Sequence, residues 1–174
     1  LIKQGCVLIS QHADSSGAPS ACEEAGVPNV AYNINTANIG PNTALISSKI
    51  SWQPYFELII NSVIEGKAIP TDYCSTLKDG GVQLTELNEK VAAKGTAEAI
   101  EDAKKKLIDG EIKVFDTKNF TVEGKELTTY LADVVDANDY VPDSEAVIDG
   151  CFSESTMRSA PYFNIIIDGI TAEQ

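Results

Sequence analysis

The chain has 174 residues, of which 43% are hydrophobic and 22% are charged. These fractions are typical of a globular protein and exclude a disordered, collagen-like or coiled-coil chain. Its 13 basic and 26 acidic residues give a formal net charge of −13. This charge argues against binding of nucleic acid or of an anionic membrane surface, because both need an excess of positive charge.

Strand and helix signals alternate over the first 50 residues. The apolar run Cys6 to Ile9 predicts a short strand buried on both faces of a sheet. After a polar loop, Pro19 lies in the first turn of a predicted helix that ends at Gly26. Further strands are expected over 29–32 and 43–50. This order predicts right-handed crossovers and an α/β protein with a layered sheet.

The next predicted helix covers residues 54–65. It has a proline at its start, and Gly66 follows its end directly. Its apolar residues have the spacing of a single buried stripe: Phe56, Ile59, Ile60, Val63 and Ile64. We expect this stripe to need a partner, because an exposed row of such side chains is an association site.

The second half of the chain gives weaker signals. A helix is predicted over 96–109, and Gly110 follows it. The ranges 112–115 and 120–122 predict a hairpin or two edge strands, and 163–167 predicts another strand. The buried face of the predicted helix is expected to consist of Ile100, Ala103, Leu107 and Ile108.

The cysteines do not indicate a metal site. Cys6, Cys22, Cys74 and Cys151 are widely separated, no C-x-x-C motif occurs, and a single histidine cannot complete a Cys/His set. We expect Cys6 and Cys22 to be small buried hydrophobes. A disulfide among the four stays open. The sequence implies neither a metal nor a cofactor.

Three polar segments follow predicted strands, over 11–17, 33–36 and 49–52. In an open α/β sheet, ligands bind beyond the carboxyl ends of the strands. The segments supply carboxylate, amide, hydroxyl and ammonium groups and one indole, which suit a polar ligand with a planar part. The alternative is that they are solvated loops that contain turn-forming residues.

Catalysis has little support in the sequence. His12 and Asp14 lie two residues apart, but no nucleophile motif such as G-x-S-x-G accompanies them. The segment 78–81 is a tight turn that lacks the phosphate-loop pattern. We therefore predict a protein that is not an enzyme. The alternative is a flavodoxin-like or Rossmann-like nucleotide-binding enzyme domain that uses the turn at 15–17, and a third hypothesis is a purely structural or regulatory domain.

Read in order, five segments resemble the basic membrane protein family of solute-binding lipoproteins of ABC importers. They are 10–17 with 22–27, 39–42, 51–56, 64–67 and 77–82, and the resemblance covers about residues 1–115. It implies the type I periplasmic-binding-protein fold, a three-layer αβα sandwich with a mainly parallel sheet. It also implies that residues 1–174 are one ligand-binding domain, the C-terminal part of a two-lobed receptor, in which 53–70 pack with the missing lobe.

The resemblance also implies a ligand site. Asn33 stands where many family members carry an aspartate that binds ribose hydroxyls, and its amide can both donate and accept hydrogen bonds. Lys49 lies near a position where some members use a lysine, and Trp52 matches a tryptophan of one branch. The implied ligand-binding residues are Asp14, Ser15, Ser16, Gly17, Asn33, Lys49 and Trp52.

The implied function is that of an extracytoplasmic solute receptor, anchored to the cell membrane by a lipid in the full-length protein. It would bind a small polar ligand without catalysis, a nucleoside being one candidate, and deliver it to an ABC permease. Because one lobe is missing, we expect the chain to form a homodimer or to swap elements.

Overall fold

The computed structural model describes residues 1–132, 144–153 and 165–171. The chain divides into two compact units, Leu1–Asp109 and Gly110–Gln174, and each is described by itself. That the whole chain forms one ligand-binding domain stays a prediction.

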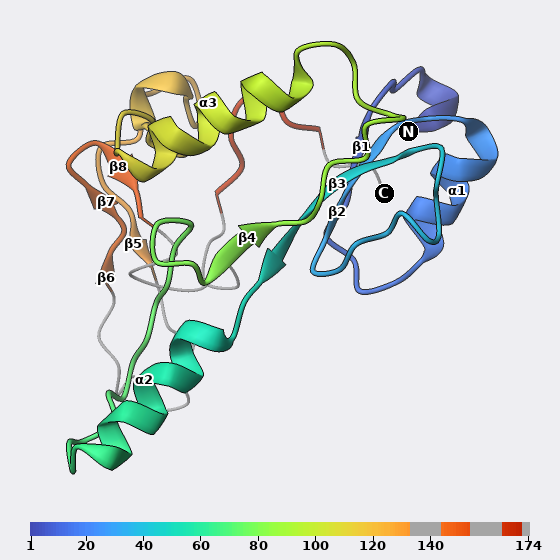
Figure 1. The fold of residues 1–174 in the computed structure, drawn as a ribbon. Helices are drawn as coiled ribbons and strands as arrows, with labels where there is room; N and C mark the ends of the chain where they lie inside the picture. The colour runs from blue at the N-terminus through green and yellow to red at the C-terminus, as the bar shows by residue number, and fades with distance from the viewer. Residues whose placement is uncertain (133–143, 154–164, 172–174) are drawn as a thin grey trace. The chain divides into compact units, whose positions relative to one another are not determined.

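A four-stranded sheet organises the first unit (Figure 1). Strands β1 (Ile9–Ser10), β2 (Asn29–Tyr32) and β3 (Ala44–Ile50) are parallel neighbours in this order. Strand β4 (Val82–Leu84) pairs antiparallel with β3. Helix α1 (Gly17–Ala25) connects β1 to β2 as a parallel crossover. The predicted α/β fold with a mainly parallel sheet is confirmed.

Strand β3 extends beyond the end of β2. Tyr32, the last residue of β2, pairs with Ser48, whereas β3 continues to Ile50, which pairs with Val82 of β4. The carboxyl edge of the sheet therefore has a step between β2 and β3.

A hydrogen-bonded cluster joins α1 to the loop that enters β3. The carboxylate of Glu23 accepts hydrogen bonds from the Asn42 backbone N–H (3.1 Å), the Asn42 side-chain amide (2.5 Å) and the Thr43 hydroxyl (2.8 Å). Desolvation raises the pKa of Glu23, but these hydrogen bonds outweigh it and hold the pKa below its ordinary value. Thr43 in turn accepts from the buried side-chain amide of Asn29 at 3.3 Å. The cluster fixes the start of β3 relative to α1.

The strand predicted from Cys6 to Ile9 is wrong over most of its length. The strand comprises only Ile9–Ser10, and the side chains of Val7 and Leu8 are 82% and 51% exposed. Only Ile9 and Ser10 reach the register with β2, because the 3₁₀ helix η1 (Ile2–Gln4) and a bend precede them. Cys22 is buried as predicted, whereas Cys6 is half-buried.

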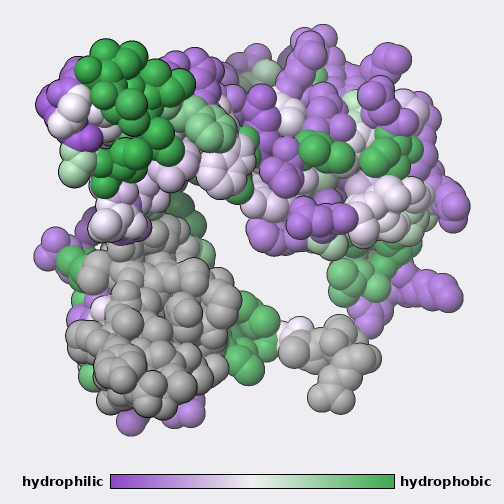
Figure 2. Space-filling view, turned by 90° about the horizontal axis from the view of Figure 1, so that it is seen from below, coloured by the Kyte–Doolittle hydropathy of each residue, from purple (hydrophilic) through white to green (hydrophobic). Residues whose placement is uncertain are grey.

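Helix α2 (Gln53–Ile64) confirms the predicted helix and exposes its apolar stripe. Ser62 is its one buried residue, while Phe56, Ile60, Val63 and Ile64 are between 55% and 76% exposed. In Figure 1 the helix continues beyond the end of β3, away from β1 and α1. Figure 2, viewed from the side on which α2 lies nearest, shows hydrophobic side chains gathered in a patch.

Helix α3 (Thr96–Ile108) forms as predicted, but its predicted buried face is wrong. None of its residues is buried; Ile100 and Ile108 are half-buried, and Ala103 and Leu107 are exposed. Ion pairs line its surface instead, between Lys104 and Glu101, Lys105 and Asp109, and Lys106 and Asp102. The spacing of apolar residues gave the correct helix but not its packing.

The described part of the second unit contains two short antiparallel pairs around a small core. Strand β5 (Leu131–Ala132) pairs with β6 (Ser144–Glu145), and β7 (Val147–Ile148) pairs with β8 (Cys151–Phe152). The buried residues Ala132, Ala146 and Phe152 form the core.

The strands predicted over 112–115 and 120–122 are wrong. The 3₁₀ helix η2 (Thr117–Asn119) lies between these ranges. Among the described residues, the pairing near them consists of two isolated bridges, Asp116 with Cys151 and Val122 with Lys125. The bridge from Asp116 leads to a distant segment, which local sequence signals do not reveal. The strand predicted over 163–167 lies partly outside the described residues, and its described part, 165–167, is not a strand.

Candidate ligand-binding site at the carboxyl edge of the sheet

A pocket of about 440 Å³ lies at the carboxyl ends of β1 and β2. The loop after β1 contributes Asp14, Ser15 and Ser16, and the loop after β2 contributes Asn33 and Thr36. The structure therefore brings together four of the predicted site residues, which come from two segments about 20 positions apart. Parallel strands place their carboxyl ends at one edge, and this geometry explains the convergence.

The first loop is held by hydrogen bonds from its start. The Gln11 backbone N–H donates to the Val30 carbonyl at 3.1 Å, which continues the pairing of β1 one residue past the strand. The Gln11 side-chain oxygen accepts from the Ala13 N–H at 2.7 Å. Ser16 precedes α1, and its side chain makes no capping hydrogen bond. Its hydroxyl at the pocket therefore does not serve the helix.

Asn33 has a strained backbone conformation at the end of β2. Its φ of 73° lies in the left-handed region, which asparagine tolerates better than most residues that carry a Cβ. Its backbone N–H donates to the Ser48 carbonyl at 2.6 Å. Within the described residues its side chain forms no hydrogen bond and lines the pocket. The backbone of Asn33 serves the sheet, and its amide group is available to a ligand.

An aromatic pair connects the loop after β1 to the end of β2. The rings of His12 and Tyr32 stack with centroids 4.0 Å apart and planes inclined by 23°, and Tyr32 lines the pocket. Sequence reasoning placed Tyr32 in a strand and did not select it as a site residue. Its position directly before Asn33 is the signal that could have identified it, because the last residue of a parallel strand lies at the ligand edge.

The other predicted residues lie elsewhere. Gly17 starts α1 and does not line this pocket. Lys49 is half-buried on β3 opposite Gln83. Trp52 is 59% exposed and lines a second pocket of about 440 Å³ with Tyr55 and Tyr73. Ser48 pairs with Tyr32, which lines the first pocket. Trp52 lies four residues beyond Ser48, and four residues of extended chain span roughly 13 Å. That all seven residues form one site stays a prediction.

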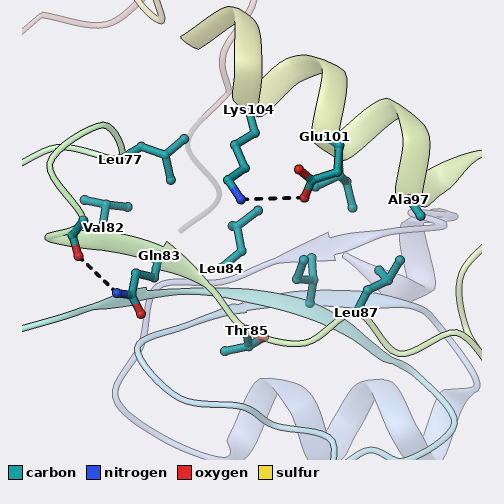
Figure 3. Close-up of a pocket in the computed structure, with 12 residues that line it drawn as sticks. Leu77, Val82, Gln83, Leu84, Thr85, Leu87, Ala97, Glu101 and Lys104 are labelled. Atoms are coloured by element: carbon teal, nitrogen blue, oxygen red, sulfur yellow. Dashed lines mark hydrogen bonds and ion pairs between the residues drawn. The ribbon is translucent and has the colours of Figure 1, made fainter. Parts of the chain in front are cut away.

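A third hollow of about 450 Å³ lies between β4 and α3 (Figure 3). Aliphatic side chains make up much of its wall, including Leu77, Leu84 and Leu87. At its rim Lys104 and Glu101 pair with each other at 3.7 Å, as the dashed line in Figure 3 shows. None of the predicted site residues lines it.

Two further observations concern metal ions and membranes. Over residues 1–132, 144–153 and 165–171, no group of three His, Cys, Asp or Glu side chains is close enough to hold a metal ion. No described helix combines the length and apolar character that a membrane span requires.

Comparison with known proteins gives distant similarities. No protein-family model matches the chain. A curated relative, a putative ABC transporter glucose-binding protein from Haloferax volcanii, is 25% identical over 126 residues, which cover 72% of this chain and 32% of that protein. The chain thus spans about a third of the length of the curated relative that it matches.

Two solved structures have a similar fold. A transcriptional activator of the comK gene from Bacillus halodurans has a TM-score of 0.56 at 22% identity and covers 64% of this chain and 40% of that one. An ABC transporter solute-binding protein from Conexibacter woesei has a TM-score of 0.51 at 18% identity, covering 65% and 38%. The chain has the α/β fold of part of a solute-binding protein, and it is similar in sequence to one ABC-transporter solute-binding protein.

Proposed function

We propose that the pocket at the carboxyl edge of β1 and β2 binds a small polar solute, as half of a cleft in the binding component of an ABC importer. The observation that carries this proposal is the convergence of Asp14, Ser15, Ser16 and Asn33 on one pocket beside the His12–Tyr32 pair. A carboxylate, two hydroxyls and an amide can bind ligand hydroxyls, while an aromatic plane can contact a sugar ring or a base.

The chemistry of the pocket favours a solute with several hydroxyl groups. The resemblance to the basic membrane protein family favours a nucleoside, whereas the Haloferax relative is described as a putative glucose-binding protein, which favours glucose. Both ligands carry adjacent hydroxyl groups. A carboxylate can accept hydrogen bonds from these hydroxyls, and a side-chain amide can either accept hydrogen bonds from them or donate to them. We extend the proposal to Gly17, Lys49 and Trp52 as further ligand contacts in the complete cleft.

The cellular role follows from the same proposal. The full-length protein would be extracytoplasmic, held at the cell membrane by a lipid anchor, and would deliver its solute to an ABC permease without turnover. Neither comparison supports the alternative of a nucleotide-binding enzyme domain. A purely structural domain would bury Asp14, Asn33 and Trp52 in packing, whereas all three are exposed.

The proposal is tested by ligand-observed NMR with glucose, adenosine and inosine on the 174-residue chain. Because one side of the cleft is missing, we expect millimolar affinity for at least one of them. Asp14→Asn and Asn33→Ala should each weaken binding several-fold, and Asp102→Asn, which removes an equal charge on α3, should not. Equal binding by the site variants and the wild type would refute the site. Micromolar binding by this chain alone would refute the two-lobe account.

A further inference from the structure

We propose that the second pocket, between the end of β3 and the first turn of α2, binds a small organic cation such as a quaternary ammonium group. Its lining includes Trp52, Tyr55, Tyr73 and Asp72. None of its lining residues lines the pocket at β1 and β2. It is therefore a pocket separate from the one at β1 and β2, and Trp52 is the residue that it shares with the wider cleft proposed above.

The aromatic rings come from separate segments and form a connected cluster. Trp52 directly precedes α2, Tyr55 lies in its first turn, and Tyr73 belongs to the loop between α2 and β4. The ring centroids of Tyr55 and Tyr73 are 5.2 Å apart, and those of Trp52 and Tyr55 are 6.2 Å apart with their planes inclined by 66°. All three residues line the same pocket.

Close backbone packing holds the loop that carries Tyr73. The Gly81 N–H donates to the Thr76 carbonyl at 3.1 Å, and the Gly81 carbonyl accepts from the Ser51 N–H at 2.8 Å. A Cβ on Gly81 would lie 2.3 Å from the Ser75 hydroxyl, so glycine is what allows the loop to approach. These contacts hold Thr76, three residues after Tyr73, close to Gly81 and Ser51, which adjoin β4 and β3.

The polar groups of the pocket select the charge of the ligand. Among the described residues that line the pocket, Asp72 is the one charged residue, and the other polar groups are hydroxyls, among them those of Ser51 and Thr71, and the indole N–H of Trp52. An anion would meet the negative charge of Asp72, and the net charge of −13 adds to this. A cation gains from both the carboxylate and the aromatic faces.

The aromatic faces are accessible to such a ligand. Trp52 is 59% exposed and Tyr73 is 38% exposed, although both are large side chains that would ordinarily gain from burial. A methylated ammonium group can fill the space between aromatic rings because it combines positive charge with an apolar surface. The pocket volume of about 440 Å³ accommodates a group of this size.

Tryptophan fluorescence gives a direct test, because Trp52 is the single tryptophan of the chain. The chain is titrated with choline and, in parallel, with 3,3-dimethylbutan-1-ol, a neutral molecule of the same shape. We expect saturable changes with choline and at least fivefold weaker binding of the neutral molecule. Equal affinity for the two, or no saturable change with choline, would overturn the proposal.

Variants separate the contributions of charge and ring. Asp72→Asn should weaken choline binding several-fold, whereas Asp102→Asn, with the same change in net charge, should leave it unchanged. Tyr73→Phe should retain binding and Tyr73→Leu should lose about two- to fivefold, the effect of one aromatic face at an exposed site. Asp14→Asn should have no effect, which distinguishes this site from the solute site. Loss of choline binding in Asp102→Asn equal to that in Asp72→Asn would also contradict the proposal.

Discussion

Gly81→Ala is the substitution whose effect the structure predicts most sharply. The added methyl group would lie 2.3 Å from both the Cβ and the hydroxyl of Ser75, and 3.4 Å from the Ser75 backbone carbon. Two carbon atoms at 2.3 Å overlap heavily, so the loop that carries Ser75 must move. Overpacking of this kind costs about 1–3 kcal/mol. For a typical urea dependence of roughly 1–3 kcal/mol per M, the unfolding midpoint falls by about 1 M.

A double substitution tests the cause of this effect. Ser75→Gly removes the two nearest atoms that the new methyl group would meet, and the next nearest, the backbone carbon at 3.4 Å, is at an ordinary van der Waals distance. We expect Gly81→Ala/Ser75→Gly to be more stable than the sum of the single effects predicts, by 1 kcal/mol or more. Urea unfolding followed by Trp52 fluorescence measures the four proteins. If Gly81→Ala unfolds at the wild-type midpoint, or if the two changes are additive, the close approach is not what constrains the loop.

Four further predictions follow from other parts of the fold. Asn33→Gly should keep the stability of the wild type, whereas Asn33→Ala should lose about 1 kcal/mol in urea unfolding, because φ at this position is 73°. The pKa of Glu23 is lower in the folded protein than in the unfolded chain, so its carboxylate stabilises the fold above its ordinary pKa. This stability is lost as the pH falls through the pKa of the folded protein. Below about pH 4.3, Tm should therefore fall less steeply with pH in Glu23→Gln than in the wild type. Burial raises the pKa of the Cys22 thiol, so a thiol reagent should react with it last, as a comparison of wild type and Cys22→Ala by mass spectrometry would show. The exposed stripe of α2 should cause self-association at micromolar concentration in light scattering, and Phe56→Ser/Ile60→Ser should restore the monomer; a monomeric wild type would contradict this.

Local signals gave the elements that depend on neighbours in sequence. Pro54 and Gly66 bracket α2, and the structure places the helix over Gln53–Ile64. The convergence of Asp14 and Asn33 was predictable too, because the carboxyl ends of parallel strands share an edge and each residue follows a strand. These successes needed only the order of the elements and the direction of the strands.

The failures concern contacts between distant segments. The apolar residues of α3 have the spacing of a buried face, but burial needs a partner surface that spacing does not specify. The run ending at Ile9 is apolar, yet only its last residue finds a partner in β2. Trp52 and Tyr73 line the same pocket because the loop that carries Tyr73 comes back to the sheet near Gly81. No local sequence pattern predicts this course of the loop.

The Glu23 cluster makes α1 a mechanical connection between the two ends of the sheet. The helix has nine residues and is therefore about 13 Å long. Its beginning follows Ser16 at the pocket at β1 and β2, while the carboxylate of Glu23, near its other end, accepts hydrogen bonds from the segment that leads into β3. A displacement of Ser16 by a bound molecule would tilt or shift the helix as a unit. The amino-terminal end of β3 would then move when a ligand binds at the opposite edge of the sheet. Changes in the NMR chemical shifts of Asn42 and Thr43, which lie at this end of β3, would detect that movement.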